Sequence, residues 1–86
     1  MKTKYIETRL NYLKESEEAV ILSINAEEKQ CRRLCSLGIV KGTKVKCIHK
    51  RKGIAAYLIR GALIGIRDED TSCICVSTKK QGGDNG

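Results

Sequence analysis

The sequence predicts a small, mainly β domain, a strongly bent barrel of short strands that carries one helix. The chain has 86 residues, which is enough for a single domain, and we place that domain at residues 1–78. Short apolar runs follow one another with tight turns between them, and this spacing favours a bent barrel over a sheet with crossover helices. One internal segment combines helical periodicity with start and stop signals, so a single helix is expected among the strands.

The N-terminal region is polar and basic. Ile6, Leu10 and Leu13 recur at intervals of four and three residues, which predicts a short amphipathic helix or turn at the entry to the domain. Residues 15–18 then form an exposed turn. The β-branched apolar run 19–24 predicts the first strand.

The amphipathic helix is predicted over residues 26–37. Asn25 and Glu28 have the spacing of a capping box, in which each side chain bonds to the other residue's backbone N–H. Cys31, Leu34 and Cys35 lie on one helical face, and both cysteines are interpreted as small core residues. Gly38 is placed to adopt the left-handed conformation that ends a helix.

Four more strands are predicted after the helix, at residues 44–49, 55–60, 62–67 and 73–76. Val45 and Cys47 face the core in the first of them. A basic hairpin loop covers 50–53, and an acidic turn covers 68–72. Gly65 predicts a bulge or a close backbone approach. The polar, Gly-containing segment 79–86 is expected to be a disordered tail.

Composition restricts the compartment and the class of protein. The charged fraction is 31% and the hydrophobic fraction 41%, as in globular domains. No apolar stretch approaches the ~20 residues of a membrane helix, and the first residues have no signal-peptide pattern. We therefore predict a cytoplasmic protein. Its five cysteines are expected to be reduced thiols, and no disulfide-linked partner is expected.

Charge is unevenly distributed along the chain and predicts a docking surface. Residues 41–52 hold six Lys or Arg and no acid, whereas residues 15–28 hold five acids and no base. A basic edge next to exposed apolar residues suits an acidic protein. Anionic lipid headgroups and a merely solvated face are the alternatives. The predicted partner-binding residues are Lys44, Lys46, Lys50, Arg51, Lys52, Ile54 and Leu63. Ile54 is expected in the loop after Gly53, and Leu63 is expected to face outward from its strand.

No catalytic set is recognisable, so the protein is not expected to be an enzyme. His49 is the only histidine. It lies two residues from Cys47, which would place both side chains on one side of a strand. The segment 38–43 lacks the spacing of a phosphate-binding loop. No resident cofactor is expected, and the weak candidates for a transition-metal site are Cys31, Cys35, Cys47 and His49.

Four segments resemble the family of FeoA, ferrous-iron transport protein A. Residues 10–13, followed by 19–21, resemble its opening turn and first strand. Residues 34–45, LCSLGIVKGTKV, resemble its signature L-x-x-L-G-[L/I]-x-x-G-x-x-[V/I]. Residues 60–67 resemble its R-G-x-x-[L/I]-[A/G]-[L/I]-R strand pair, and residues 74–76 resemble its closing I-x-V strand. The resemblance covers residues 10–76. The chain departs from the family pattern in containing no proline, a difference expected to affect turn rigidity more than fold.

The resemblance implies an SH3-like β-barrel and an accessory role in bacterial ferrous iron uptake. The implied partner is the membrane transporter FeoB, with its cytosolic GTPase region, and membrane contact is expected only through that partner. A nucleic-acid-binding small β-barrel is one alternative. Because Tyr57 is the only tyrosine in the predicted barrel strands, no nucleic acid is expected. A metal-responsive regulatory module is the other alternative, since the SH3-like domain of iron-dependent repressors is similar.

Overall fold

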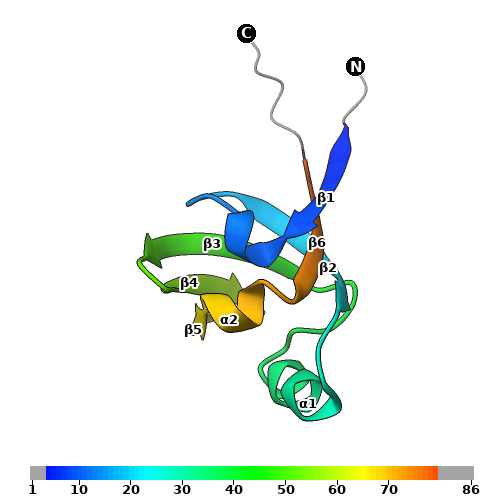
Figure 1. Ribbon diagram of the computed structural model, residues 1–86. Coiled ribbons are helices and arrows are strands. Elements are labelled where there is room, and N and C mark those ends of the chain that lie inside the picture. The colour runs from blue at the N-terminus through cyan, green and yellow to red at the C-terminus, as the bar shows by residue number, and fades with distance from the viewer. Residues whose placement is uncertain (1–3, 80–86) are drawn as a thin grey trace, which may run out of the picture.

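The computed structural model describes residues 4–79 as one twisted antiparallel sheet with a helix attached to it (Figure 1). The order of the strands in the sheet is β1-β6-β2-β3-β4-β5. The strands are β1 (Tyr5–Arg9), β2 (Glu18–Ile24), β3 (Lys44–Arg51), β4 (Ile54–Ile59), β5 (Ala62–Arg67) and β6 (Ile74–Lys79). The helical segments are η1 (Leu10–Tyr12), α1 (Glu28–Ser36) and α2 (Asp68–Thr71). The prediction of a mainly β fold with one principal helix is therefore confirmed.

The N-terminal prediction is wrong for residues 5–9. Instead of a helix, these residues form β1, which pairs with β6 from Tyr5↔Lys79 to Arg9↔Cys75. A single 3-10 turn follows, and it buries Leu10. The apolar spacing that suggested a helix arises because Leu10 and Leu13 enter the core beyond the strand, whereas Ile6 is 44% exposed. Pairing with a strand near the other end of the chain outweighs this local pattern.

The predicted helix is confirmed as α1, but its start differs. The N-cap residue is Glu27, whose side chain makes no capping bond within residues 4–79. The backbone N–H of Asn25 donates instead to the carbonyl of Cys73, so the capping box is absent. At the other end the predicted stop is confirmed. Gly38 has φ +98°, and the N–H groups of Gly38 and Ile39 donate to the carbonyls of Cys35 and Leu34, which is a Schellman motif.

Two tight turns set the register of the β3-β4-β5 meander, Lys52–Gly53 between β3 and β4 and Arg60–Gly61 between β4 and β5. The turn between β4 and β5 consists of Arg60 and Gly61, with φ values of +51° and +83°. Positive φ at both central residues is the requirement of a type I′ hairpin turn.

The predicted bulge at Gly65 is wrong, because Gly65 pairs with Ala56 in unbroken register. Register shifts occur instead in β3, between Cys47 and His49, and in β2, between Ile21 and Ser23.

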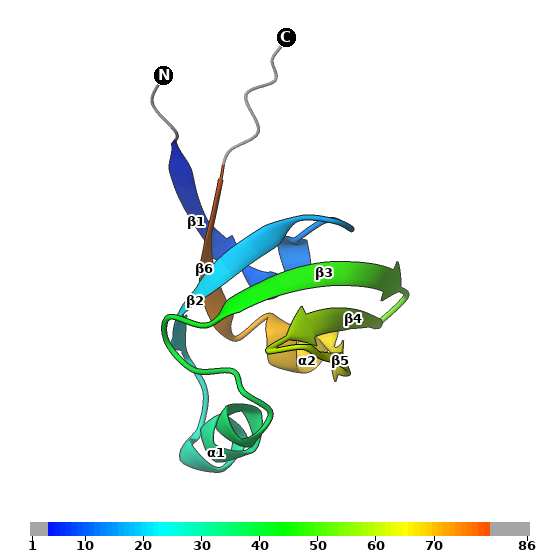
Figure 2. The ribbon, with the colours of Figure 1, turned by 180° about the vertical axis from the view of Figure 1, so that it is seen from behind.

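The core lies on the concave side of the bent sheet, and every strand except β1 contributes a buried side chain to it. The buried hydrophobic residues are Leu10, Leu13, Ala19, Ile21, Leu34, Ile39, Val45, Cys47, Ala55, Tyr57, Ile59, Ile66, Ile74 and Val76. The inward prediction for Val45 and Cys47 is thus confirmed. Figure 2, from behind, shows β2 and β3 side by side, with α1 set apart from the sheet.

The C-terminal boundary moves slightly. Strand β6 continues to Lys79, so the first residue of the predicted tail belongs to the sheet. The remainder of that tail, residues 80–86, lies outside the described residues. Neither helix between residues 4 and 79 is long and apolar enough to cross a membrane.

Candidate functional site

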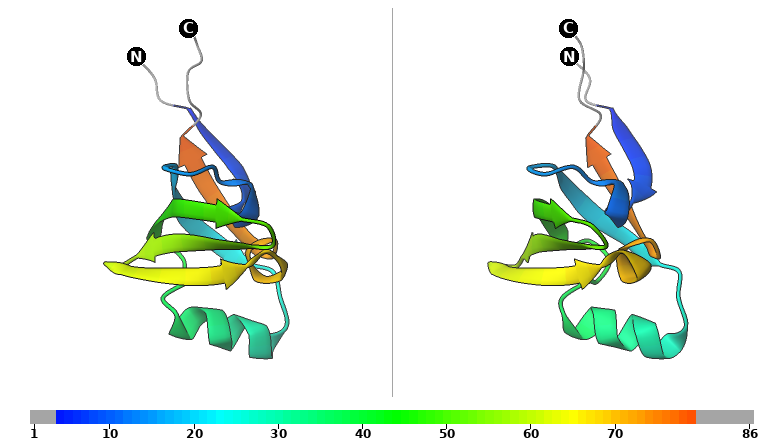
Figure 3. Two further views of the ribbon diagram at one scale, coloured as in Figure 1. Left: turned by 90° about the vertical axis from the view of Figure 1, so that its left-hand side faces the viewer. Right: turned by 60° about the vertical axis from the view of Figure 1, so that its left-hand side comes forward.

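The outer side of β3, β4 and β5, facing away from the core, carries an exposed apolar surface. The left panel of Figure 3 shows these three strands side by side. The register places their outward residues in three rows across the strands: Lys46, Leu58 and Leu63; His49, Ala56 and Gly65; and Arg51, Ile54 and Arg67. We call these rows, together with Ile48 at the β3 bulge, the outer face.

Large aliphatic side chains on this face remain in contact with solvent. Leu63 is 62% exposed, Ile54 and Leu58 are each 40% exposed, and Ile48 is 39% exposed. Single exposed aliphatic residues are ordinary, but a contiguous group of them is typical of a binding surface. The middle row is low because Ala56 and Gly65 have little or no side chain.

The charge around this surface has one sign along the chain. Residues 44–67 contain seven Lys or Arg and no Asp or Glu. The cationic residues are Lys44, Lys46, Lys50, Arg51, Lys52, Arg60 and Arg67. A partner for this region therefore has to combine apolar and anionic groups.

The structure brings four of the seven predicted partner-binding residues together. Lys46, Arg51, Ile54 and Leu63 all lie on the outer face. Ile54, expected in a loop, is instead the first residue of β4 and pairs with Arg51. The outward direction predicted for Leu63 is confirmed.

The other three predicted residues lie elsewhere. The Nζ of Lys50 donates to the backbone carbonyl of Asn11 at 2.9 Å, which directs Lys50 toward η1. Lys44 lies at the start of β3, with its Nζ 4.0 Å from a carboxylate oxygen of Glu18. Lys52 lies in the exposed turn between β3 and β4.

Sequence reasoning missed Leu58 and Ile48. Strand alternation was sufficient to find Leu58, because Tyr57 and Ile59 on either side of it are buried. Ile48 was harder to find, because its outward position depends on the irregular register of β3.

Acidic residues far away in sequence reduce the basic character of β3. The β2-β3 pairing sets Glu18 opposite Lys46. A carboxylate oxygen of Glu15 lies 3.4 Å from the Nδ1 of His49 and accepts a hydrogen bond from the backbone N–H of Lys50. The stretch 41–52 is basic along the chain, but in space its β2 side is partly neutralised.

The metal candidates Cys47 and His49 do not share one side of β3, contrary to prediction. Cys47 is fully buried, whereas His49 is exposed, because the bulge between them reverses the alternation. Burial raises the pKa of the Cys47 thiol, and the nearby Lys50 opposes this only in part. A neutral, enclosed thiol is a poor nucleophile and a poor metal ligand.

The other two metal candidates, Cys31 and Cys35, lie on α1. Leu34 is the one fully buried residue of this helix. Cys31 is half-buried and its thiol faces the carbonyl of Ala26, whereas Cys35 is exposed. The core interpretation is therefore wrong for Cys35. Within residues 4–79 no three His, Cys, Asp or Glu side chains gather as a metal site would require.

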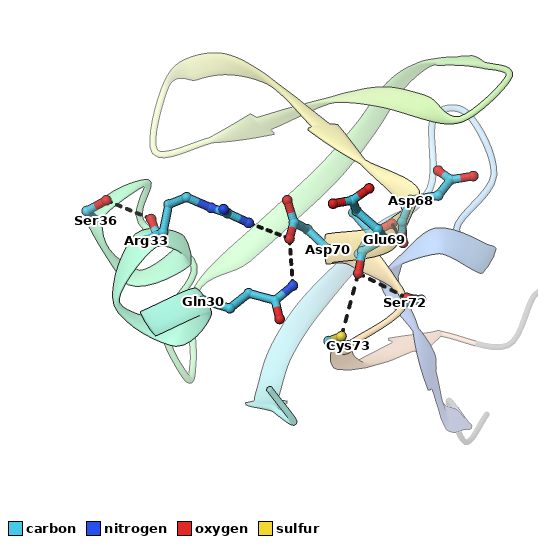
Figure 4. A network of polar contacts seen from close by, with 9 residues as sticks. Gln30, Arg33, Ser36, Asp68, Glu69, Asp70, Ser72 and Cys73 are labelled. Carbon is cyan, nitrogen blue, oxygen red and sulfur yellow. Dashed lines mark hydrogen bonds and ion pairs between the residues drawn. The ribbon is translucent and has the colours of Figure 1, made fainter. Parts of the chain in front are cut away.

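The acidic turn at 68–72 forms α2 and holds α1 in place (Figure 4). One oxygen of Asp70 accepts hydrogen bonds from Gln30 and from Arg33, both at 2.6 Å. The Asp70 side chain is only 13% exposed. A shielded carboxylate with two donors makes strong charge-assisted bonds, so Asp70 has a structural role between two helices.

The prediction that Tyr57 is the only tyrosine in the strands is wrong, because Tyr5 lies in β1 and is 62% exposed. Tyr57 itself is not available for base stacking. Tyr57 is fully buried, and its hydroxyl donates to the carbonyl of Leu10 at 3.4 Å. The exposed side chains on the outer face are aliphatic or basic, and none of them is a Phe, Trp or Tyr. This composition suits a protein surface better than unstacked bases, which bind to aromatic platforms.

Comparison with known proteins places the chain in a family. Residues 8–78 match the FeoA domain model. The protein named Fe(2+) transport protein A in Campylobacter jejuni is 32% identical over 65 residues, which cover 76% of this chain and 77% of the relative. Its namesake in Methanocaldococcus jannaschii is 33% identical over 76 residues, covering 88% of this chain and 93% of the relative.

A solved structure supports the fold. FeoA from Stenotrophomonas maltophilia, complexed with zinc and described as a prokaryotic SH3 domain protein, superposes with a TM-score of 0.71. It is 24% identical, and the match covers 80% of this chain and 88% of that chain. The SH3-like fold is therefore confirmed. The chain belongs to the FeoA family, whose members are non-enzymatic accessory proteins associated with ferrous iron transport.

Proposed function

We propose that this protein acts in the cytoplasm as an accessory protein of ferrous iron uptake, binding the cytosolic GTPase-containing region of a FeoB transporter and modulating it. Family membership and relatives named for Fe(2+) transport support the iron-transport role. The observation that carries the binding role is the outer face, where exposed aliphatic residues lie within a stretch of sequence, residues 44–67, that contains seven Lys or Arg and no acid. The proposal assigns no resident metal to this chain.

Modulation follows from binding only if the protein prefers one state of the transporter. A ligand shifts a two-state equilibrium by no more than its difference in affinity for the two states. A tenfold preference corresponds to about 1.4 kcal/mol, which a few contacts on a surface of this kind can supply.

The test is a calorimetric titration of the protein with the purified cytosolic region of FeoB from the same organism. We expect saturable binding that persists at moderate salt, because apolar contacts contribute alongside charge. Absence of binding at several hundred micromolar, at both low and moderate salt, would refute the direct interaction. A parallel titration with single-stranded RNA separates the alternative. Tight RNA binding that falls steeply with added salt would instead favour a nucleic-acid-binding barrel.

A further inference from the structure

We infer that the outer face binds an amphipathic α-helix of the partner. This helix lies across β3, β4 and β5, with its apolar side against the sheet and acidic residues along its flanks. This inference rests on the proposed function and specifies which surface, and which kind of partner segment, makes the contact. Shape and charge support it.

The two outer rows carry larger side chains than the middle row, and the distance between the outer rows is suitable for a helix. Residues two apart on a strand are about 7 Å apart, so the two outer rows are separated by roughly 13 Å. An α-helix with its side chains is about 10–12 Å across. Leu58 and Leu63 border one side, Ile54 borders the other, and the low Ala56–Gly65 row lies between them. The Cδ1 of Ile54 already leans over Gly65, 3.7 Å from where a Cβ would stand.

The charged residues around the outer face indicate where the acidic residues of the bound helix lie. Lys46, His49 and Arg51 lie at the β3 end of the rows, where acidic residues of the partner would meet them. Glu18 and Glu15 partly neutralise the first two, whereas no carboxylate within residues 4–79 pairs with Arg51. At the opposite corner Asp68 and Glu69 lie beside Ile54 and Arg67, so positive charge is weaker there. The partner's acids are therefore expected mainly toward β3.

A second copy of this chain fits the face poorly. Residues 44–67 carry seven cations and no acid, so two such faces in contact would bring mostly like charges together. The bordering acids Glu15, Glu18, Asp68 and Glu69 oppose this only in part. The outer side of β2 and β6 is also a poor candidate. It combines Glu18, Lys44, Lys46 and Lys79 around two exposed hydrophobic residues, Tyr5 and Val20, instead of a group of four aliphatic residues.

The first experiment measures the affinity of variants for the cytosolic region of FeoB. Leu63→Glu places an acid among the aliphatic residues, and Gly65→Leu fills the low row. Gly65 has an ordinary backbone conformation, and a Cβ added there would meet the Cδ1 of Ile54 at an ordinary van der Waals distance of 3.7 Å, so both variants should fold. We expect Leu63→Glu to weaken binding about 30-fold or more and Gly65→Leu about tenfold. Val20→Glu, exposed on the other half of the sheet, is the matched control and should change affinity less than about twofold.

The outcomes distinguish the two proposals. If the wild-type protein binds and both outer-face variants bind equally well, the proposed function stands, but the outer face is not the helix-binding site. If the wild-type protein does not bind, the proposed function fails, and a second probe tests whether the outer face binds a helix. That probe is a synthetic helical peptide with a leucine stripe flanked by glutamates, titrated by NMR against a version with lysines in place of the glutamates.

The peptide should shift backbone amide signals in β4 and β5, and its lysine version should bind more weakly. Shifts confined to other elements, or equal binding of both peptides, would overturn the inference. Vesicles containing phosphatidylglycerol form the last arm. If the vesicles shift the amide signals of the outer face and the glutamate peptide does not, the face is a lipid-binding surface, and the inference of a bound helix is refuted.

Discussion

The two halves of the sheet share one core but have different outer sides. On the outer side of β1, β6 and β2, charged residues of both signs occur together, Glu7 and Glu18 with Arg9 and Lys79, beside the exposed side chains of Tyr5 and Val20. On the outer side of β3, β4 and β5, the charged residues are cations and four large aliphatic residues stay exposed. Folding requires only the inner side of a half-buried sheet to be apolar. The apolar outer side of the second half is therefore best explained by binding.

The strongest test of this comparison uses adjacent residues in β4. Ile59 is 1% exposed and faces the core, whereas Leu58 is 40% exposed and faces outward. Ile59→Ala should reduce the free energy of unfolding by about 2–5 kcal/mol, through lost burial and a cavity. Leu58→Ala should cost less than about 1 kcal/mol. Urea unfolding of the two variants measures both values. A loss of about 3 kcal/mol from Leu58→Ala would show that the outer face stabilises the fold.

Alkaline pH tests the inner side of the same half. Burial, helped by the neighbouring Cys47, raises the pKa of Tyr57 to about 12, against 10.0 for a free tyrosine. Because the folded state holds this proton more tightly than the unfolded chain, the contribution is complete below pH 10 and is lost as pH rises toward 12. The difference of two pKa units corresponds to about 3 kcal/mol.

The measurement compares unfolding free energies at pH 9 and near pH 12. Tyr57→Phe should lose less stability than the wild-type protein over this interval, because it has no phenol to ionise. Tyr5→Phe is the matched control, since it removes a tyrosine from a position that is 62% exposed on the first half. Identical losses of unfolding free energy in the wild-type protein and in Tyr57→Phe would mean that Tyr57 is not shielded from water in the core beneath the outer face.

Local patterns predicted the second half of the sheet better than the first. Alternation along 44–49 and 62–67 was enough to assign Val45 and Cys47 inward and Leu63 outward, because each strand there pairs with its neighbour in sequence. Strand β1 pairs with β6, some seventy residues away, and no local pattern carries that information. The helix stop at Gly38 was predictable because it depends on one residue's backbone freedom.

The candidate site was predictable only in part, for a reason found in β3. A one-residue bulge after Cys47 turns Ile48 and His49 outward together. It separates the expected Cys47–His49 pair and adds an unexpected aliphatic residue to the outer face. A bulge is fixed by the pairing of two strands, so the sequence of β3 alone does not reveal it. The acids near β3 were missed for the same reason, since they reach it through pairing with β2.

The smallest expected effect concerns the line where the two halves meet. The carboxylate of Glu18 lies 4.0 Å from the Nζ of Lys44, and the two side chains are 54% and 69% exposed. Exposed pairs of this kind contribute little, so Glu18→Gln should change the free energy of unfolding by less than about 0.5 kcal/mol. The same variant removes a negative charge beside Lys46 and should modestly accelerate association with an acidic partner, most visibly at low salt. Chemical denaturation and stopped-flow association measure the two effects. A faster association with unchanged stability would mean that the charge boundary between the halves directs binding, whereas a loss of more than about 1 kcal/mol would make it part of the fold.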